Sequence, residues 1–270
     1  MRKHSCDGKD EEMNQKEMEE NELKQIQIER VEIKRAQSEQ REPEKKLPCR
    51  LPENHYPVVC FDLDGTLIDG TVFIWETLHD YFKTDLEKRN RAREDFFSGR
   101  IPYRAWFEND LELLSARGAD RERIAIMLKE KMRPMIGAHE TLDVLRRAGV
   151  KTAILSGSLD VVLSAFYEPE MFDVVFLNKV RFDEIGVLSG GVATLYDLEK
   201  KGEGLLEIAA RLGVSPSECA FVGDNYNDLS AAAVAGRSIA FCPKSSDLRD
   251  QADVTIEERD LRAILPHLAM

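Results

Sequence analysis

The sequence predicts an α/β fold, a doubly wound parallel sheet with a small inserted helical cap. Short apolar runs alternate with amphipathic segments from residue 56 onward, which is typical of parallel strands joined by helices. The first two apolar runs lie about ninety residues apart, too far for a simple crossover connection. We therefore expect a catalytic core formed by residues 54–76 and 134–270, interrupted by a cap at residues 77–133.

Residues 1–53 differ in composition from the rest of the chain. They are rich in Glu, Lys, Gln and Arg, and residues 1–46 contain no aromatic side chain. Such a segment buries too little apolar area to offset its chain entropy. We expect a charged extension that is disordered or partly helical, followed by a proline-containing linker at residues 47–57.

Five short runs are apolar on both faces, as expected of buried parallel strands. They are residues 57–61, 151–155, 173–177, 219–223 and 238–242. Four amphipathic stretches between them predict helices, and three of the four end in glycine, a common helix stop. These stretches are residues 137–149, 159–167, 202–213 and 228–236. Residues 181–195 instead predict a β-hairpin that turns near Glu184–Gly186.

The insertion itself predicts a helical cap. Its residues 76–82, 108–118 and 121–132 have helical periodicity, and the last of these stretches stops before Pro134. Helices placed over an active site can exclude water and select the substrate. We therefore expect the cap to take part in substrate binding.

Composition and charge restrict the function. The net charge of −12 and pI near 5.1 argue against a nucleic-acid partner, because such binding depends on Lys and Arg. No run approaches the ~18 apolar residues of a membrane span, and the N-terminus lacks the apolar region of a secretory signal. The five cysteines are scattered without a CxxC pair, so we expect a cytoplasmic protein without a disulfide framework. Its oligomeric state is not predicted.

Two pairs of aspartates follow predicted strands. Asp62 and Asp64 come directly after the first strand, and Asp224 and Asp228 follow the strand at residues 219–223. Ligands of an open parallel sheet bind at the carboxyl ends of its strands. Carboxylates gathered there repel one another unless a cation lies among them, and Mg²⁺ prefers such oxygen ligands. We therefore predict a magnesium site, and expect Asp69 to be a solvated turn residue.

An anion site is predicted beside the metal. Ser156 and Gly157 lie where a strand passes into a helix, so a hydroxyl and free backbone N–H groups face the same sheet edge. Lys200 and Lys201 begin another predicted helix, and either one offers a positive charge to a phosphate oxygen. Metal, anion site and lysine together predict phosphoryl transfer to or from a small phosphorylated metabolite.

Four motifs in order resemble those of the haloacid dehalogenase superfamily: "DLDGT" (62–66), "LSGS" (155–158), "KGEGL" (201–205) and "GDNYND" (223–228). The resemblance covers residues 54–270 and is strongest to the phosphoserine phosphatase-like branch. It implies a Rossmann-like core and a Mg²⁺-dependent phosphatase. Asp62 would be the nucleophile that forms an aspartyl-phosphate, and Asp64 would be the general acid and base.

The resemblance also implies further site residues. Magnesium would be held by Asp62, Asp64 through its carbonyl, Asp224 and Asp228. The phosphoryl group would be bound by Thr66, Ser156, Gly157 and Lys201, and Lys201 is preferred to Lys200 because it directly precedes "GE". Candidate substrate contacts are Thr71, Trp75, Arg104 and Asn227.

The chain departs from that branch at two positions. Thr71 stands where an acidic residue would hold the substrate amine, and Asp110 stands where an arginine would hold its carboxylate. Two alternative functions remain: a phosphomutase of the same superfamily, and a non-catalytic phosphate-binding scaffold. Asp228 also has a structural alternative, since it could cap the helix that follows.

Overall fold

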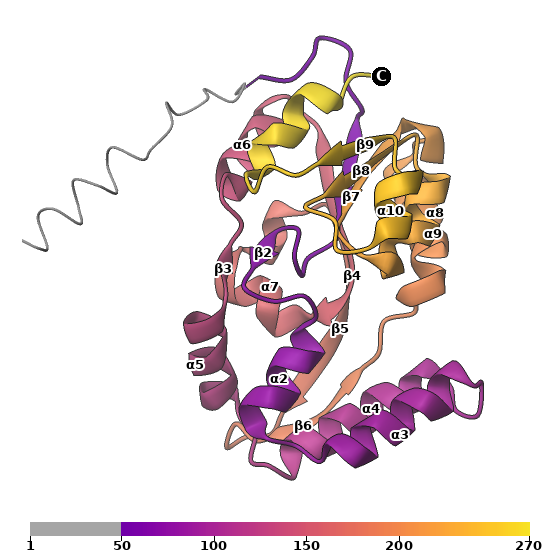
Figure 1. Cartoon of the computed structure of the whole chain (residues 1–270). Coiled ribbons are helices and arrows are strands. Elements are labelled where there is room, and N and C mark those ends of the chain that lie inside the picture. Colours follow the sequence, from indigo (N-terminus) through magenta and orange to yellow (C-terminus); the bar gives the residue numbers. More distant parts are fainter. Residues whose placement is uncertain (1–49) are drawn as a thin grey trace, which may run out of the picture. The chain divides into compact units, whose positions relative to one another are not determined.

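The computed structural model describes residues 50–270, so the predicted extension at residues 1–53 lies almost wholly outside the described part of the chain. These residues form a seven-stranded sheet with the order β6-β5-β4-β1-β7-β8-β9 (Figure 1). The strands are β1 (Val58–Phe61), β4 (Lys151–Leu159), β5 (Val174–Phe182), β6 (Leu188–Val192), β7 (Cys219–Gly223), β8 (Arg237–Phe241) and β9 (Val254–Ile256). All neighbours are parallel except β5 and β6. The predicted α/β class is confirmed.

Strand β1 lies at the centre of the sheet. Val58 is in register with Lys151 of β4 on one side and Cys219 of β7 on the other. All four β1 residues are fully buried, which explains why this run is apolar on both faces. The five predicted strands are present, whereas β9, only three residues long, was not predicted.

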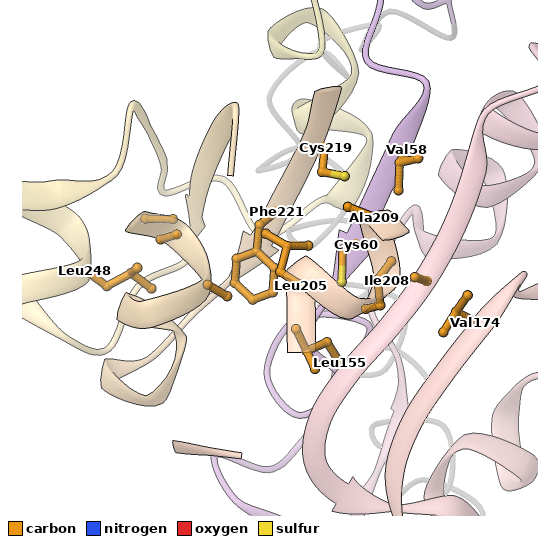
Figure 2. Packing of buried hydrophobic residues seen from close by; sticks show 14 residues of the cluster. Val58, Cys60, Leu155, Val174, Leu205, Ile208, Ala209, Cys219, Phe221 and Leu248 are labelled. Carbon is orange, nitrogen blue, oxygen red and sulfur yellow. The ribbon is translucent and has the colours of Figure 1, made fainter. Parts of the chain in front are cut away.

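Helices cover the sheet. These are α6 (Ala138–Arg147), α7 (Asp160–Phe166), α8 (Lys201–Leu212), α9 (Leu229–Val234) and α10 (Ser246–Gln251). Figure 1 shows α8, α9 and α10 together on one side of the sheet. Leu205 and Ile208 of α8 pack on Cys60, Leu155 and Phe221 of the strands (Figure 2). This apolar contact fixes the start of α8 near the carboxyl ends of β1 and β4.

The predicted β-hairpin is present and turns at Gly186, whose φ is 87°. The first strand of this hairpin continues directly from the predicted strand at residues 173–177. Together they form the nine-residue strand β5. The hairpin therefore extends the sheet itself. Helix α4 packs against its second strand, β6.

Four helices lie between β1 and α6: α2 (Ile74–Phe82), α3 (Leu86–Phe97), α4 (Tyr103–Ser115) and α5 (Arg121–Lys131). Three of them correspond to predicted helices. Helix α3 was missed because its sequence is mostly charged and buries only Ala92; it begins where the Asp85 side chain accepts a hydrogen bond from Lys88 N. These helices fill the segment predicted as a cap, while its status as a separate domain remains a prediction.

A two-stranded sheet joins the ends of this helical segment. It pairs β2 (Ile68–Asp69) with β3 (Arg133–Pro134). Asp69 was expected to be solvated, and that prediction is wrong: the residue is 2% exposed and forms ion pairs with Arg133 and Arg259. Its buried carboxylate needs these partners, and Arg259 is 190 residues away in sequence. Within residues 50–270, no helix has the length and apolar character needed to cross a membrane.

Candidate active site

The sheet brings both pairs of aspartates to one edge. Strands β1 and β7 are parallel neighbours, and Asp62 and Asp224 directly follow them. Asp62 N donates a hydrogen bond to the Val222 carbonyl at 2.9 Å. The backbone pairing of β1 with β7 therefore continues as far as Asp62. The side chains of Asp62, Asp64, Asp224 and Asp228 are all buried. Their convergence follows from the topology of the fold.

Three of these carboxylates could hold a metal ion. Asp62, Asp224 and Asp228 each offer an oxygen, and the three oxygens lie within 4.8 Å of one another. Asp224 Oδ1 is buried without a hydrogen-bond partner, an expensive state for a carboxylate oxygen. An all-oxygen set with one unsatisfied acceptor fits a hard divalent cation such as Mg²⁺.

Asp228 has a structural role as well. Its Oδ2 accepts hydrogen bonds from the backbone N–H groups of Asp224 and Asn225 at 2.8 and 3.0 Å. It thereby caps the short η4 turn (Tyr226–Asp228), while Oδ1 faces Lys201. As the N-cap residue of the following helix α9, Asp228 makes no side-chain cap hydrogen bond, so the predicted capping of that helix is wrong and the side chain instead joins the preceding turn to the site.

Burial, together with the neighbouring charges, raises the pKa of two of these carboxyl groups. Burial, followed by the charges of Asp62 and Asp228, raises the pKa of Asp224 well above its usual value. Burial also raises the pKa of Asp228 to about 6, opposed by the neighbouring Lys201. A bound cation would act in the same direction as Lys201 and favour the ionised forms.

Lys201 is the buried cation of the site. It is fully buried at the start of α8, with Nζ 2.6 Å from both Asp62 Oδ1 and Asp228 Oδ1. Burial alone would lower its pKa, but the charges of Asp228 and Asp62 outweigh burial and raise it. Lys200 ends the η2 turn (Leu198–Lys200) and lines a different cavity. The geometry therefore favours Lys201 as the lysine of the phosphate site.

A second lysine was missed at the sequence level. Lys244 Nζ forms an ion pair with Asp224 Oδ2. It lies beside the turn after β1, where a Cβ on Gly65 would overlap both Lys244 Nζ and Asp224 Oδ2. Gly65 also has a φ of +77°, so this position requires glycine. Lys244 stands alone in a loop without a recognisable motif, and only the fold brings it to Asp224.

Asp64 is placed differently from Asp62. Its Oδ1 accepts a hydrogen bond from Ser158 Oγ at 2.8 Å, and its Oδ2 accepts one from Ile74 N at 2.7 Å. Burial first, and the charge of Asp62 second, raise the pKa of Asp64 to about 7. A carboxyl group with such a pKa can hold or release a proton near neutrality.

The register of β4 against β5 shifts between Leu155 and Leu159, and this bulged part of the strand (the 156–158 loop) lies next to these carboxylates. Ser156 is buried, and its Oγ accepts a hydrogen bond from Ser158 N at 3.2 Å. The Gly157 carbonyl accepts hydrogen bonds from Trp75 Nε1 at 3.0 Å and Asn178 Nδ2 at 2.7 Å. Trp75 thus holds this loop in place. Ser158, within the quoted "LSGS", and Asn178 were not singled out from the sequence.

The remaining predicted residues occupy varied positions. Thr66 and Asn227 are buried, and Thr66 Oγ1 and Asn227 Oδ1 have no hydrogen-bond partner. Thr71 Oγ1 lies 2.8 Å from Thr77 Oγ1. The exposed Arg104 pairs with Glu108 through its Nε at 2.7 Å. Asp110, the second departure from the resembled branch, is buried with Oδ1 3.5 Å from His79 Nε2.

Known proteins resemble this chain over most of its length. The sequence model of the haloacid dehalogenase-like hydrolase family matches residues 56–236. A phosphoserine phosphatase of Methanocaldococcus jannaschii is 29% identical over 219 residues, covering 80% of this chain and 99% of the relative. The phosphoserine phosphatase of Wolinella succinogenes is 31% identical over 209 residues, covering 77% and 98%.

Solved structures agree with this similarity. A substrate-bound phosphoserine phosphatase complex matches with a TM-score of 0.60 and 28% identity, covering 79% of this chain and 98% of the other. A phospho-aspartyl intermediate analogue of phosphoserine phosphatase matches with a TM-score of 0.58 and 26% identity, with the same coverage.

Proposed function

The chain belongs to the haloacid dehalogenase-like hydrolase family, and we propose that it is a phosphatase that cleaves a small phosphomonoester through an aspartyl-phosphate on Asp62. One observation carries the assignment of roles. Asp62 lies 2.6 Å from a buried lysine, while the nearby Asp64 has a pKa raised to about 7. The lysine favours the ionised form of Asp62, which a nucleophile needs, whereas the raised pKa of Asp64 favours the protonated form, which a proton donor needs.

In the first step, a carboxylate oxygen of Asp62 bonds to phosphorus and the bond from phosphorus to the ester oxygen breaks. Protonated Asp64 gives its proton to that ester oxygen, which leaves as an alcohol. The Ser158 hydroxyl and Ile74 N–H fix the Asp64 side chain during this transfer. Such a positioned acid contributes roughly 10²–10⁴-fold to the rate.

In the second step, water attacks phosphorus of the aspartyl-phosphate and the bond to the Asp62 oxygen breaks. Asp64, now ionised, takes a proton from that water and returns to its starting state. Inorganic phosphate leaves and the Asp62 carboxylate is restored. Lys201, Ser156 and Thr66, all buried at this edge, would bind the phosphoryl oxygens throughout.

The site would hold Mg²⁺ through Asp62, Asp224, Asp228 and the Asp64 carbonyl. The unsatisfied Asp224 Oδ1 and the cluster of three oxygens support this choice. When bound, the ion would neutralise negative charge on the phosphoryl group. Lys244 and Lys201, which contact Asp224 and Asp62, position the carboxylates for it.

The assignment is tested with p-nitrophenyl phosphate and the full chain. We expect phosphate release that requires Mg²⁺ and is lost in Asp62→Asn. The matched control is Asp80→Asn, an exposed aspartate of α2, which should leave turnover unchanged. A scaffold would show no Mg²⁺-dependent release, and a phosphomutase would convert a sugar phosphate without releasing phosphate.

Phosphoserine is the first natural compound to test, because the relatives are phosphoserine phosphatases. A cytoplasmic location remains part of this proposal.

A further inference from the structure

One cavity of the described chain lies between the inserted helices and the segment before α8, and its lining contains none of the four site aspartates. It has a volume of about 920 Å³, at the upper end of the range for sites that enclose a drug-sized molecule. Helices α3 and α4 form one wall, and the segment from β6 to α8 forms the other. Figure 1 shows α3 and α4 beside each other next to β6.

The inner wall of this cavity adjoins Gly157 of the 156–158 loop. Tyr103 and Asp197 both line the cavity, and Tyr103 OH donates to Asp197 Oδ2 at 2.9 Å. A Cβ on Gly157 would overlap the Asp197 carboxylate, so this carboxylate lies directly on the loop. Asn178 Nδ2 joins Tyr103 OH to the Gly157 carbonyl, at 2.9 and 2.7 Å. The cavity therefore begins one side chain away from the proposed phosphoryl site.

The outer part of the cavity is apolar. Phe97, Val192 and Leu195 line it and are 54%, 55% and 74% exposed. They come from three separate segments: the end of α3, the end of β6 and the loop before α8. Large apolar side chains that gather at one exposed site indicate binding of an apolar group.

Six charged side chains line this cavity. Three of them, Arg181, Glu199 and Lys200, are exposed to solvent, and the other three have partners within the chain. Arg104 pairs with Glu108 at 2.7 Å. Asp197 accepts hydrogen bonds from Tyr103 and from Leu198 N, the latter at 2.7 Å. An ammonium or carboxylate placed beside Arg104 or Asp197 would have to displace these partners, whereas an apolar group would cover bare apolar surface.

We propose that this cavity, the leaving-group cavity, receives the alcohol part of the substrate, and that this alcohol is an extended apolar one. The inference rests on the proposed function, because it assigns the substrate class of the same site. The phosphate would lie at Asp62 and Lys201, and the carbon chain would extend past Tyr103 toward Val192 and Leu195.

Ethyl phosphate and n-hexyl phosphate test the inference with the full chain and Mg²⁺. Their alcohols have similar acidity, so the chemical step is matched and only the apolar contacts differ. Each methylene that becomes buried should raise kcat/KM about fourfold. We expect n-hexyl phosphate to exceed ethyl phosphate by at least about tenfold, mainly through a lower KM, because the added contacts are present in ground and transition states alike.

A charge placed in the lining should remove this preference. Leu195→Glu should reduce the hexyl-to-ethyl ratio of kcat/KM at least about fivefold. The matched control is Ile185→Glu at the hairpin turn, where the native side chain is 84% exposed and lies outside the cavity lining. It should leave the ratio unchanged. Thermal unfolding of both variants checks that each one is folded.

The outcomes separate the two levels of the proposal. Turnover of p-nitrophenyl phosphate with a hexyl-to-ethyl ratio near one overturns the leaving-group cavity and leaves the phosphatase standing. Faster turnover of phosphoserine than of n-hexyl phosphate overturns it as well. If none of these esters releases phosphate, the proposed function fails and the substrate class fails with it.

Discussion

Replacing Lys201 by methionine should both destabilise the protein and make its stability depend more strongly on magnesium. The native Nζ lies 2.6 Å from Asp62 and Asp228, and all three side chains are buried. Methionine keeps much of the volume but leaves two buried carboxylates without their cation. Breaking a buried ion pair by removing one partner costs about 3–5 kcal/mol. We expect a loss of free energy of unfolding in that range in the absence of Mg²⁺.

Magnesium should recover part of this loss. A ligand at about 100 times its dissociation constant stabilises the native state by about 2.7 kcal/mol. In Lys201→Met the ion would also take over neutralisation of Asp62 and Asp228, so its stabilising effect should be larger than in the wild type. Urea unfolding, with EDTA or with Mg²⁺, measures this increment in each protein.

The control is Lys200→Met, which changes the neighbouring lysine that does not contact the aspartates. It should stay within about 0.5 kcal/mol of the wild type, as surface substitutions usually do. Two results would refute the reasoning: equal stability of the two variants without Mg²⁺, or the same Mg²⁺ increment in Lys201→Met and the wild type.

Three further predictions concern other parts of the structure. Asp64→Asn should lower kcat for alkyl phosphates by about 10²–10⁴-fold; stopped-flow phosphate release measures this, and a change below about tenfold would contradict the proton-transfer role. Gly157→Ala should reduce kcat/KM, because its Cβ would overlap the Asp197 carboxylate; unaltered kinetics would show that the loop yields freely. Hydrogen bonds from Arg262 lower the pKa of Asp260, so its charged form stabilises the fold above the usual pKa of about 4, and this contribution is lost as the pH falls toward the lowered folded pKa. The urea midpoints of wild type and Asp260→Asn should therefore differ at pH 7 and converge below about pH 4, whereas a pH-independent difference would exclude the charge as the cause.

The convergence of the aspartates was predictable because the apolar strand pattern and the acidic residues coincide in the sequence. Each buried parallel strand is apolar on both faces, so its end is easily found in the sequence. Asp62 and Asp224 follow two such ends, and parallel topology necessarily places both at one edge. Lys201 was harder, since Lys200 precedes it and both begin a helix. Only the packing of α8 on the sheet decides which of them is buried.

Features that depend on tertiary contacts could not be predicted. Asp69 is buried because Arg133 and Arg259 reach it, and neither arginine stands out in the sequence. Helix α3 has little apolar periodicity, so local capping and its packing on α4 define it. The leaving-group cavity combines three distant segments, each of which has an unremarkable apolar residue. Sequence patterns identify individual helices and strands, whereas these features depend on contacts between segments that are far apart in the sequence.

The arrangement of lysines explains how the acidic site can exist without the proposed metal ion. Lys201 contacts Asp62 and Asp228, and Lys244 contacts Asp224. The two cations therefore leave the carboxylate cluster short of full neutralisation, with Asp224 Oδ1 as the buried acceptor that has no partner. A third lysine beside Asp224 Oδ1 would neutralise the remaining negative charge of the three aspartates, and a cation would then gain little by binding. The fold thus holds the carboxylates together while keeping one oxygen available, and affinity for a divalent cation follows from that incomplete compensation.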